Sequence, residues 1–157
     1  MSPVSETARS SNTGGSSLGT LEARLIGTWR LVSAEDYDPK TKKWVPYTFG
    51  NPPSGYFIYG ASGYASVQIM FTPPVQLSNP DNGPTPDEAL KILNRYIAYY
   101  GRWKADEKTI TVVPEGNLNP AQLGAANPQT RPYQLNGDTL TIGSTEAGYI
   151  RTLQRVG

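Results

Sequence analysis

Residues 27–36 read Gly-Thr-Trp-Arg-Leu-Val-Ser-Ala-Glu-Asp, and this stretch decides the fold class. Its side chains alternate with a period of two, which is typical of a β-strand. We expect a strand over residues 28–36 with two distinct faces. One face carries Trp29, Leu31, Ser33 and Glu35, and the other carries Arg30, Val32 and Ala34. If Trp29 points into the core, this alternation predicts that Glu35 points inward as well.

The same period continues along most of the chain. Asn136-Gly137 is a strong hairpin signal, and Gly60-Ala61-Ser62-Gly63 is another. We expect further strands at residues 43–49, 55–59, 64–71, 98–105, 109–113, 131–135, 139–142 and 148–156. So many sequential strands in one short domain favour an all-β fold, an up-and-down antiparallel β-barrel of about eight to ten strands. Such a barrel has room for one small ligand.

One short helix interrupts the strands. Thr85-Pro86-Asp87-Glu88 is a capping box with proline at the first helical position, and it predicts a helix from about 86 to 96 near the barrel mouth. Residues 1–20 are rich in Ser, Gly and Thr and have almost nothing to bury. We therefore divide the chain into a disordered tail (1–20) and a barrel domain (21–157).

The composition excludes several kinds of chemistry. The 157 residues include no histidine and no cysteine, so thiolate or histidine catalysis and His/Cys metal sites are ruled out. A formal net charge of +1 gives no strong electrostatic attraction for the phosphate backbone of a nucleic acid. The sequence also lacks phosphate-binding glycine motifs, a secretory signal and a membrane span. We expect no metal, no cofactor, no nucleic-acid or membrane partner, a cytoplasmic location, and a monomer or homodimer.

Several stretches resemble the lipocalin-like family of small bacterial and fungal proteins. They are Gly27–Ser33, Pro53-Ser54-Gly55 with Tyr59 and Gly63-Tyr64, Tyr99–Trp103, Thr109–Thr111 through Glu115–Pro120, and Gly137–Thr141. The resemblance implies a ligand-holding barrel in which Trp29 plugs the closed end under an arginine, Arg151 or Arg155. Family members often have two histidines where this chain has Val112-Val113, so no imidazole function is carried over.

The resemblance also suggests what the barrel does. Some fungal proteins of this type look like cofactor-free isomerases or cyclases of natural-product (secondary-metabolite) pathways. Our first hypothesis is therefore an isomerase or cyclase that acts on a bulky, largely apolar or aromatic substrate by general acid/base catalysis. The alternatives are a non-catalytic small-molecule carrier and an interaction module whose barrel is plugged.

Polar side chains on the strands and at their ends supply candidate catalytic groups. The candidate acid/base carboxylate is Glu115, where a strand runs out, with an exposed loop carboxylate as the alternative reading, and Glu35 is the second choice. Arg30 has apolar neighbours on its strand face, so it either stabilises carbonyl charge or is a surface arginine. Tyr96 and Tyr100 are candidate proton donors, with packing as the alternative.

A second set of residues is expected to bind the substrate. Arg102 shares strand parity with Tyr100 and could share its environment. Tyr64 and Gln68 belong to a polar stripe that is either the outward face of a strand or an orienting set inside the barrel. Tyr99 and Trp103 supply aromatic surface to the pocket.

Overall fold

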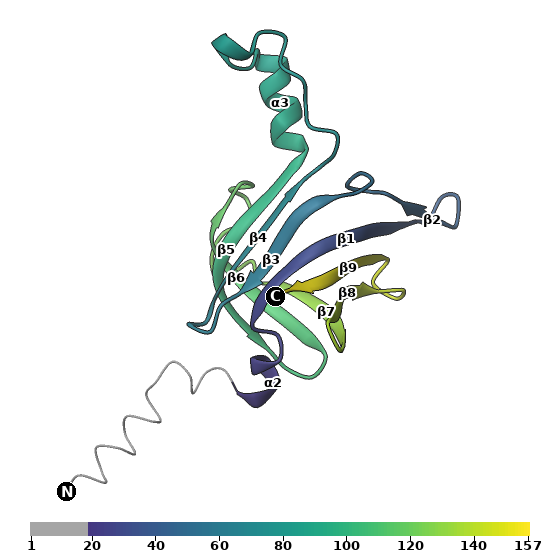
Figure 1. Cartoon of the computed structure of the whole chain (residues 1–157), viewed down its shortest axis with the longest axis vertical. Coiled ribbons are helices and arrows are strands. Elements are labelled where there is room, and N and C mark those ends of the chain that lie inside the picture. The colour runs from purple at the N-terminus through teal and green to yellow at the C-terminus, as the bar shows by residue number, and fades with distance from the viewer. Residues whose placement is uncertain (1–18) are drawn as a thin grey trace, which may run out of the picture.

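The computed structural model describes residues 19–157, so the predicted tail lies outside the described residues except for Gly19 and Thr20 (Figure 1). Helices are short: α2 (Thr20–Ala23), a 3-10 turn η2 (Pro80–Asn82) and α3 (Pro86–Asn94). The strands are β1 (Gly27–Asp38), β2 (Lys43–Pro46), β3 (Ser54–Tyr59), β4 (Tyr64–Met70), β5 (Tyr96–Ala105), β6 (Thr109–Asn117), β7 (Gln129–Asn136), β8 (Thr139–Ser144) and β9 (Tyr149–Val156).

Every strand pairs antiparallel with its neighbours in the order β2-β1-β3-β4-β5-β6-β7-β8-β9. β9 pairs in addition with β1, from Thr28 opposite Val156 to Asp36 opposite Tyr149. This pairing closes eight strands into a barrel, while β2 extends beside the far half of β1 (Figure 1). The predicted up-and-down barrel is confirmed.

The closed end of the barrel is built around Trp29, which is fully buried. The indole N–H of Trp29 donates to the carbonyl oxygen of Leu25 at 2.9 Å. The guanidinium of Arg155 lies 4.2 Å from the centre of the indole ring. It also donates to the carbonyl oxygens of Ile26 (2.9 Å) and Arg24 (2.6 Å). Arg155, rather than Arg151, is therefore the arginine over the tryptophan plug.

A β-bulge in β1 changes which side chains point inward. The register with β9 shifts between Leu31 and Ser33, so that Val32 has no partner. Beyond this point the inward residue is Ala34, which is 1% exposed. The expectation that Glu35 shares the inward face of Trp29 is wrong, because the extra residue reverses the alternation.

Strand β2 is shorter than the predicted strand at residues 43–49. It ends at Pro46, and the next residue, Tyr47, has a left-handed backbone (φ 62°) that cannot continue a strand. The chain then turns so that Phe49 is buried. This turn brings an aromatic ring from outside the regular sheet into the barrel.

The helix α3 projects from one end of the barrel, beyond the ends of β4 and β5 (Figure 1). It has the predicted capping box: Thr85 Oγ1 accepts from the amide of Glu88 (3.2 Å), and Glu88 Oε1 accepts from the amide of Thr85 (2.9 Å). No residue of α3 is buried, and Leu90 and Leu93 are exposed. Its position is set by the two strands that flank it and by its caps.

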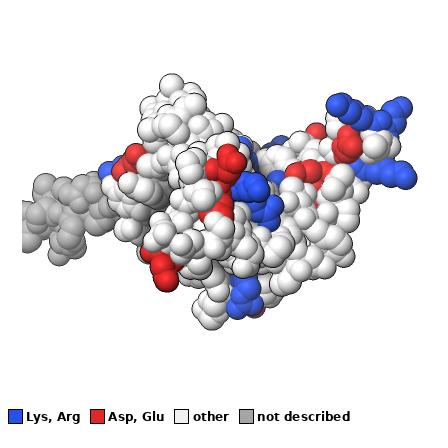
Figure 2. Space-filling view, turned by 90° about the horizontal axis from the view of Figure 1, so that it is seen from above, with Lys and Arg blue, Asp and Glu red and all other residues white. Residues whose placement is uncertain are grey.

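Charged side chains are scattered over the face seen in Figure 2, apart from a basic group at one end. This end is the β1–β2 turn, which carries Lys40, Lys42 and Lys43. Within residues 19–157, no helix has the length and apolar character needed to cross a membrane.

Candidate functional site

The barrel encloses a cavity of about 320 Å³. Strands β3 to β9 contribute inward side chains, and Phe49 completes the lining. The lining residues are Phe49, Phe57, Tyr59, Val67, Ile69, Ile97, Tyr99, Ile110, Val112, Gln129, Arg131, Ile142, Tyr149 and Arg151. The size is typical of a small-molecule site, and so is a mostly apolar wall with a few polar groups.

A second hollow of about 540 Å³ lies at the barrel mouth and shares Ile97, Tyr99, Gln129 and Arg131 with the first. It exists because β6 and β7 pair over only four residues each, 109–112 with 129–132. Among the strands, the rest of β6 pairs only with β5, and the segment after β6 contacts it through the hydrogen bond from the amide of Gly124 to the carbonyl oxygen of Pro114 (2.8 Å). The two hollows are therefore adjacent and meet at these four shared residues.

The end of α3 contributes to this mouth through Leu93 and Asn94. The opposite side is formed by the segment that follows β6, including Leu118 and Pro120. The predicted position of the helix near the barrel mouth is confirmed.

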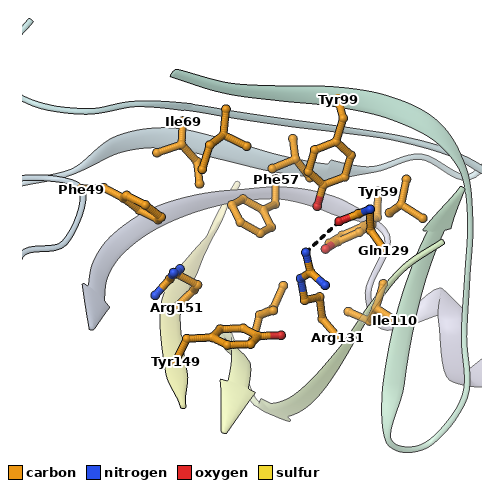
Figure 3. A pocket seen from close by; sticks show the side chains of 14 residues that line it. Phe49, Phe57, Tyr59, Ile69, Tyr99, Ile110, Gln129, Arg131, Tyr149 and Arg151 are labelled. Atoms are coloured by element: carbon orange, nitrogen blue, oxygen red, sulfur yellow. Dashed lines mark hydrogen bonds between the residues drawn. The ribbon is translucent and has the colours of Figure 1, made fainter. Parts of the chain in front are cut away.

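Polar groups gather at one place in the lumen, which we call the lumen polar cluster: Tyr59, Tyr99, Tyr149, Gln129 and Arg131. The guanidinium of Arg131 donates to Gln129 Oε1 at 2.8 Å and lies 5.9 Å from the ring centre of Tyr149. Figure 3 shows the hydroxyls of Tyr59 and Tyr99 beside this pair. The cluster combines one fixed cation with several hydroxyl donors.

Burial raises the pKa of Tyr59 well above that of a free phenol. Burial also raises the pKa values of Tyr99 and Tyr149, and the charge of Arg131 offsets only part of the effect at each site. Desolvation disfavours the phenolate in all three cases. These hydroxyls are therefore neutral at physiological pH and act as hydrogen-bond donors.

A second arginine, Arg151, lines the same cavity but is already paired. Its Nη1 donates to Asp36 Oδ1 at 2.8 Å and to the carbonyl oxygen of Glu35 at 3.0 Å. The guanidinium also lies 4.5 Å from the ring centre of Phe49 and 5.3 Å from that of Tyr149. Arg151 therefore fixes two aromatic walls of the lumen, and its charge is balanced by a carboxylate.

Of the predicted site residues on β5, Tyr99 points into the lumen and Tyr100 and Arg102 point outward. Tyr100 is 57% exposed and lies against Gly116 of β6. The guanidinium of Arg102 lies 4.8 Å from the ring centre of Tyr64, on the outer wall. The expectation that Arg102 and Tyr100 share a lumen environment is wrong, because buried Trp103 fixes the opposite parity for this strand.

The polar stripe on β4 is the outward face of that strand. Gln68 accepts a hydrogen bond from the Tyr96 hydroxyl at 2.9 Å, and both residues line a shallow outer groove. Tyr96 also reaches the rim of the mouth. Trp103 is buried below the cavity, where it packs against Tyr59 at 5.0 Å between ring centres.

Two predicted catalytic residues, Arg30 and Glu115, are exposed and line none of the cavities described above. Glu115 stands at a second bulge, where Gly101 pairs with Pro114 and Tyr100 pairs with Gly116. Pro114 points inward at this bulge and is fully buried. Glu115 therefore faces solvent, and none of the lumen lining is a carboxylate.

The site residues expected from the sequence do not include Gln129, Arg131 or Tyr149. For Gln129 and Arg131, the residue pattern of the strand does indicate an inward position. Along β7 one face carries Gln129, Arg131, Tyr133 and Leu135, and the other carries Thr130, Pro132, Gln134 and Asn136. The aromatic and aliphatic residues mark the first face as inward, and this places Arg131 in the barrel.

In the described part of the chain no group of three or more acidic side chains could hold a metal ion. A ligand in this barrel would instead meet aromatic walls, hydroxyl donors and the guanidinium of Arg131, which has no carboxylate partner in the described residues.

Comparison with known proteins agrees with this architecture. The sequence model of the lipocalin-like domain matches residues 26–154, so the chain belongs to the lipocalin-like domain family. Such a barrel is compatible with ligand binding. No curated protein matches the chain.

Two solved structures are similar to the chain. One is an uncharacterized protein from Bacteroides eggerthii, with 13% identity, a TM-score of 0.44, and coverage of 83% of this chain and 98% of that one. The other is a mutant of the fluorescent protein UnaG, with 12% identity, a TM-score of 0.37, and coverage of 85% and 96%.

Proposed function

We propose that this protein binds a bulky, largely apolar small molecule inside the barrel. The observation that carries the proposal is the lumen cavity of about 320 Å³, which adjoins a mouth of about 540 Å³. Burial of an apolar ligand against side chains such as Phe57, Ile69 and Ile142 supplies the driving force. We keep two sequence-based predictions with this proposal, a cytoplasmic location and a monomer or homodimer.

The test is a fluorescence titration with phenylnaphthylamine, a neutral aromatic probe. We expect saturable binding at one site per chain. Val112→Trp adds a large side chain to the lumen wall and should weaken binding by about tenfold or more, because the lost space cannot be recovered in a close-packed wall. Val32→Trp makes the same change on the outer wall, where Val32 is 47% exposed. Equal weakening by both variants, or by neither, would contradict binding in the lumen.

A cofactor-independent isomerase or cyclase is the second candidate function. It is favoured by the convergence of Arg131 with the neutral hydroxyls of Tyr59 and Tyr99, since such donors stabilise a developing enolate oxygen. The exposed positions of Glu115 and Arg30 give no support to their proposed catalytic roles. A proton acceptor would have to be water or a group of the substrate itself.

This second function is tested by hydrogen exchange at the α-carbon of beta-tetralone in heavy water, followed by NMR. A catalyst removes a proton to solvent and returns a deuteron, so the ketone gains deuterium with no other change. We expect Tyr99→Phe to slow any exchange that the protein accelerates, and Glu115→Gln to leave it unchanged. An exchange rate equal to that of buffer leaves binding as the function and removes this candidate.

A further inference from the structure

The hydrogen-bond donors of the lumen polar cluster outnumber its acceptors. A guanidinium carries five N–H donors and no acceptor. Arg131 uses its donors on Gln129 Oε1 (2.8 Å) and on the carbonyl oxygen of Thr130 (3.3 Å). Within residues 19–157, the hydroxyls of Tyr59, Tyr99 and Tyr149 have no hydrogen bond to a protein group, and none of them is sealed from the cavity that they line. Acceptors must therefore come from what occupies the cavity.

The charge in the cavity is unbalanced in the same place. The ion pairs of residues 19–157 are Arg151 with Asp36 and Arg155 with Asp138, so Arg131 has no carboxylate partner there. No carboxylate lines the lumen or the mouth. A partly buried guanidinium that faces aromatic and aliphatic side chains attracts an anion strongly, because water screens it poorly.

We infer that the ligand is an apolar or aromatic organic acid, ionised at neutral pH, whose oxyanion contacts Arg131 and the hydroxyls of Tyr59, Tyr99 and Tyr149. This inference rests on the proposed binding function and names its ligand class. A carboxylate offers about four lone-pair sites, which suits a guanidinium edge and several hydroxyls better than a single carbonyl oxygen does. The apolar body then lies against the remaining wall.

Two other features agree with an anion. Burial raises the pKa values of the three phenols, so they stay protonated and add no competing negative charge. Arg151 is balanced by Asp36 and held between Phe49 and Tyr149, so it supports the wall without drawing the oxyanion away from Arg131.

The test uses two fluorescent probes, anilinonaphthalene sulfonate and phenylnaphthylamine. They share the same aromatic rings, and only the first carries an anion. We expect the wild-type protein to bind the anion at least about tenfold more tightly, which is the scale of a hydrogen bond to a charged group. Arg131→Gln should remove this preference while binding of the neutral probe persists. Arg102→Gln, which removes an arginine from the outer wall, should leave both affinities unchanged.

The outcomes separate this inference from the proposed function. Equal affinities in the wild-type protein, or a preference that survives Arg131→Gln, would overturn the inference and leave ligand binding in place. Absence of binding by both probes would overturn both. If Arg131→Gln does not fold, Tyr149→Phe provides the test, because it keeps the ring and removes one donor. It should weaken binding of the anion severalfold and leave the neutral probe unaffected, and unchanged anion binding would contradict the inference.

Discussion

Replacement of Arg155 by methionine should destabilise the barrel by about 3 kcal/mol. Two hydrogen bonds from its guanidinium to the carbonyl oxygens of Ile26 and Arg24 would be lost, each worth about 1.5 kcal/mol at the low end for a charged donor. The contact with the Trp29 ring adds about 0.5–1 kcal/mol, part of which the methionine side chain recovers by covering the indole. The ion pair with Asp138 adds little, since the Asp138 side chain is 71% exposed.

The assay is urea unfolding at neutral pH, followed by tryptophan fluorescence. The matched control is Asp138→Asn, which should change the free energy of unfolding by no more than about 0.5 kcal/mol. Arg155→Lys should lie between the control and Arg155→Met, because an ammonium keeps the charge but lacks the planar fork that reaches two carbonyls. A loss below about 1 kcal/mol for Arg155→Met would refute the idea that this arginine holds the closed end together.

Two further predictions concern pH and the projecting helix. Burial raises the pKa values of Tyr59, Tyr99 and Tyr149. The unfolded chain therefore loses these protons near pH 10, while the folded chain keeps them. The free energy of unfolding is unaffected below that pH and falls as the pH rises through the folded pKa values. In this range each such tyrosine lowers the free energy of unfolding by about 1.4 kcal/mol per pH unit. Denaturation measured between pH 8 and 11 should show a shallower fall of this free energy for Tyr59→Phe than for the wild-type protein. An identical fall would contradict the raised pKa of Tyr59. Thr85→Ala should cost about 1 kcal/mol of local stability in α3, visible as roughly fivefold faster amide exchange in the helix. The melting temperature of the barrel should not change, because no residue of α3 is buried, and a lower one would show that the helix supports the barrel.

The barrel and the capped helix could be predicted because each rests on a local pattern. Alternation defines strands, Asn136-Gly137 defines a hairpin, and the capping box at Thr85 defines a helix start. The binding residues depend instead on which face of each strand is inward. A bulge reverses that face, and the alternation of residue types in the sequence does not reveal it. The bulge at Val32 turns Glu35 away from the inward face in this way.

Strand β5 illustrates the same difficulty in another form. Tyr99 and Tyr100 are adjacent and chemically equal, so the choice between them depends on a neighbour of known orientation. Buried Trp103 supplies this orientation, since it shares parity with Tyr99 and not with Tyr100. A similar comparison along β7 places Arg131 inward beside Tyr133. Faces are therefore better assigned from the bulkiest apolar residue of each strand than from the position of charged residues.

The short pairing between β6 and β7 has a consequence for the rate at which a ligand leaves. The mouth is lined by side chains of β5, the end of α3 and the segment after β6, so departure through it breaks none of the strand-pairing hydrogen bonds that close the barrel. The residence time of a ligand is then set by side chains at the gap and by the segment after β6, not by the free energy of unfolding. Residence time and thermal stability can therefore change independently in variants of this protein.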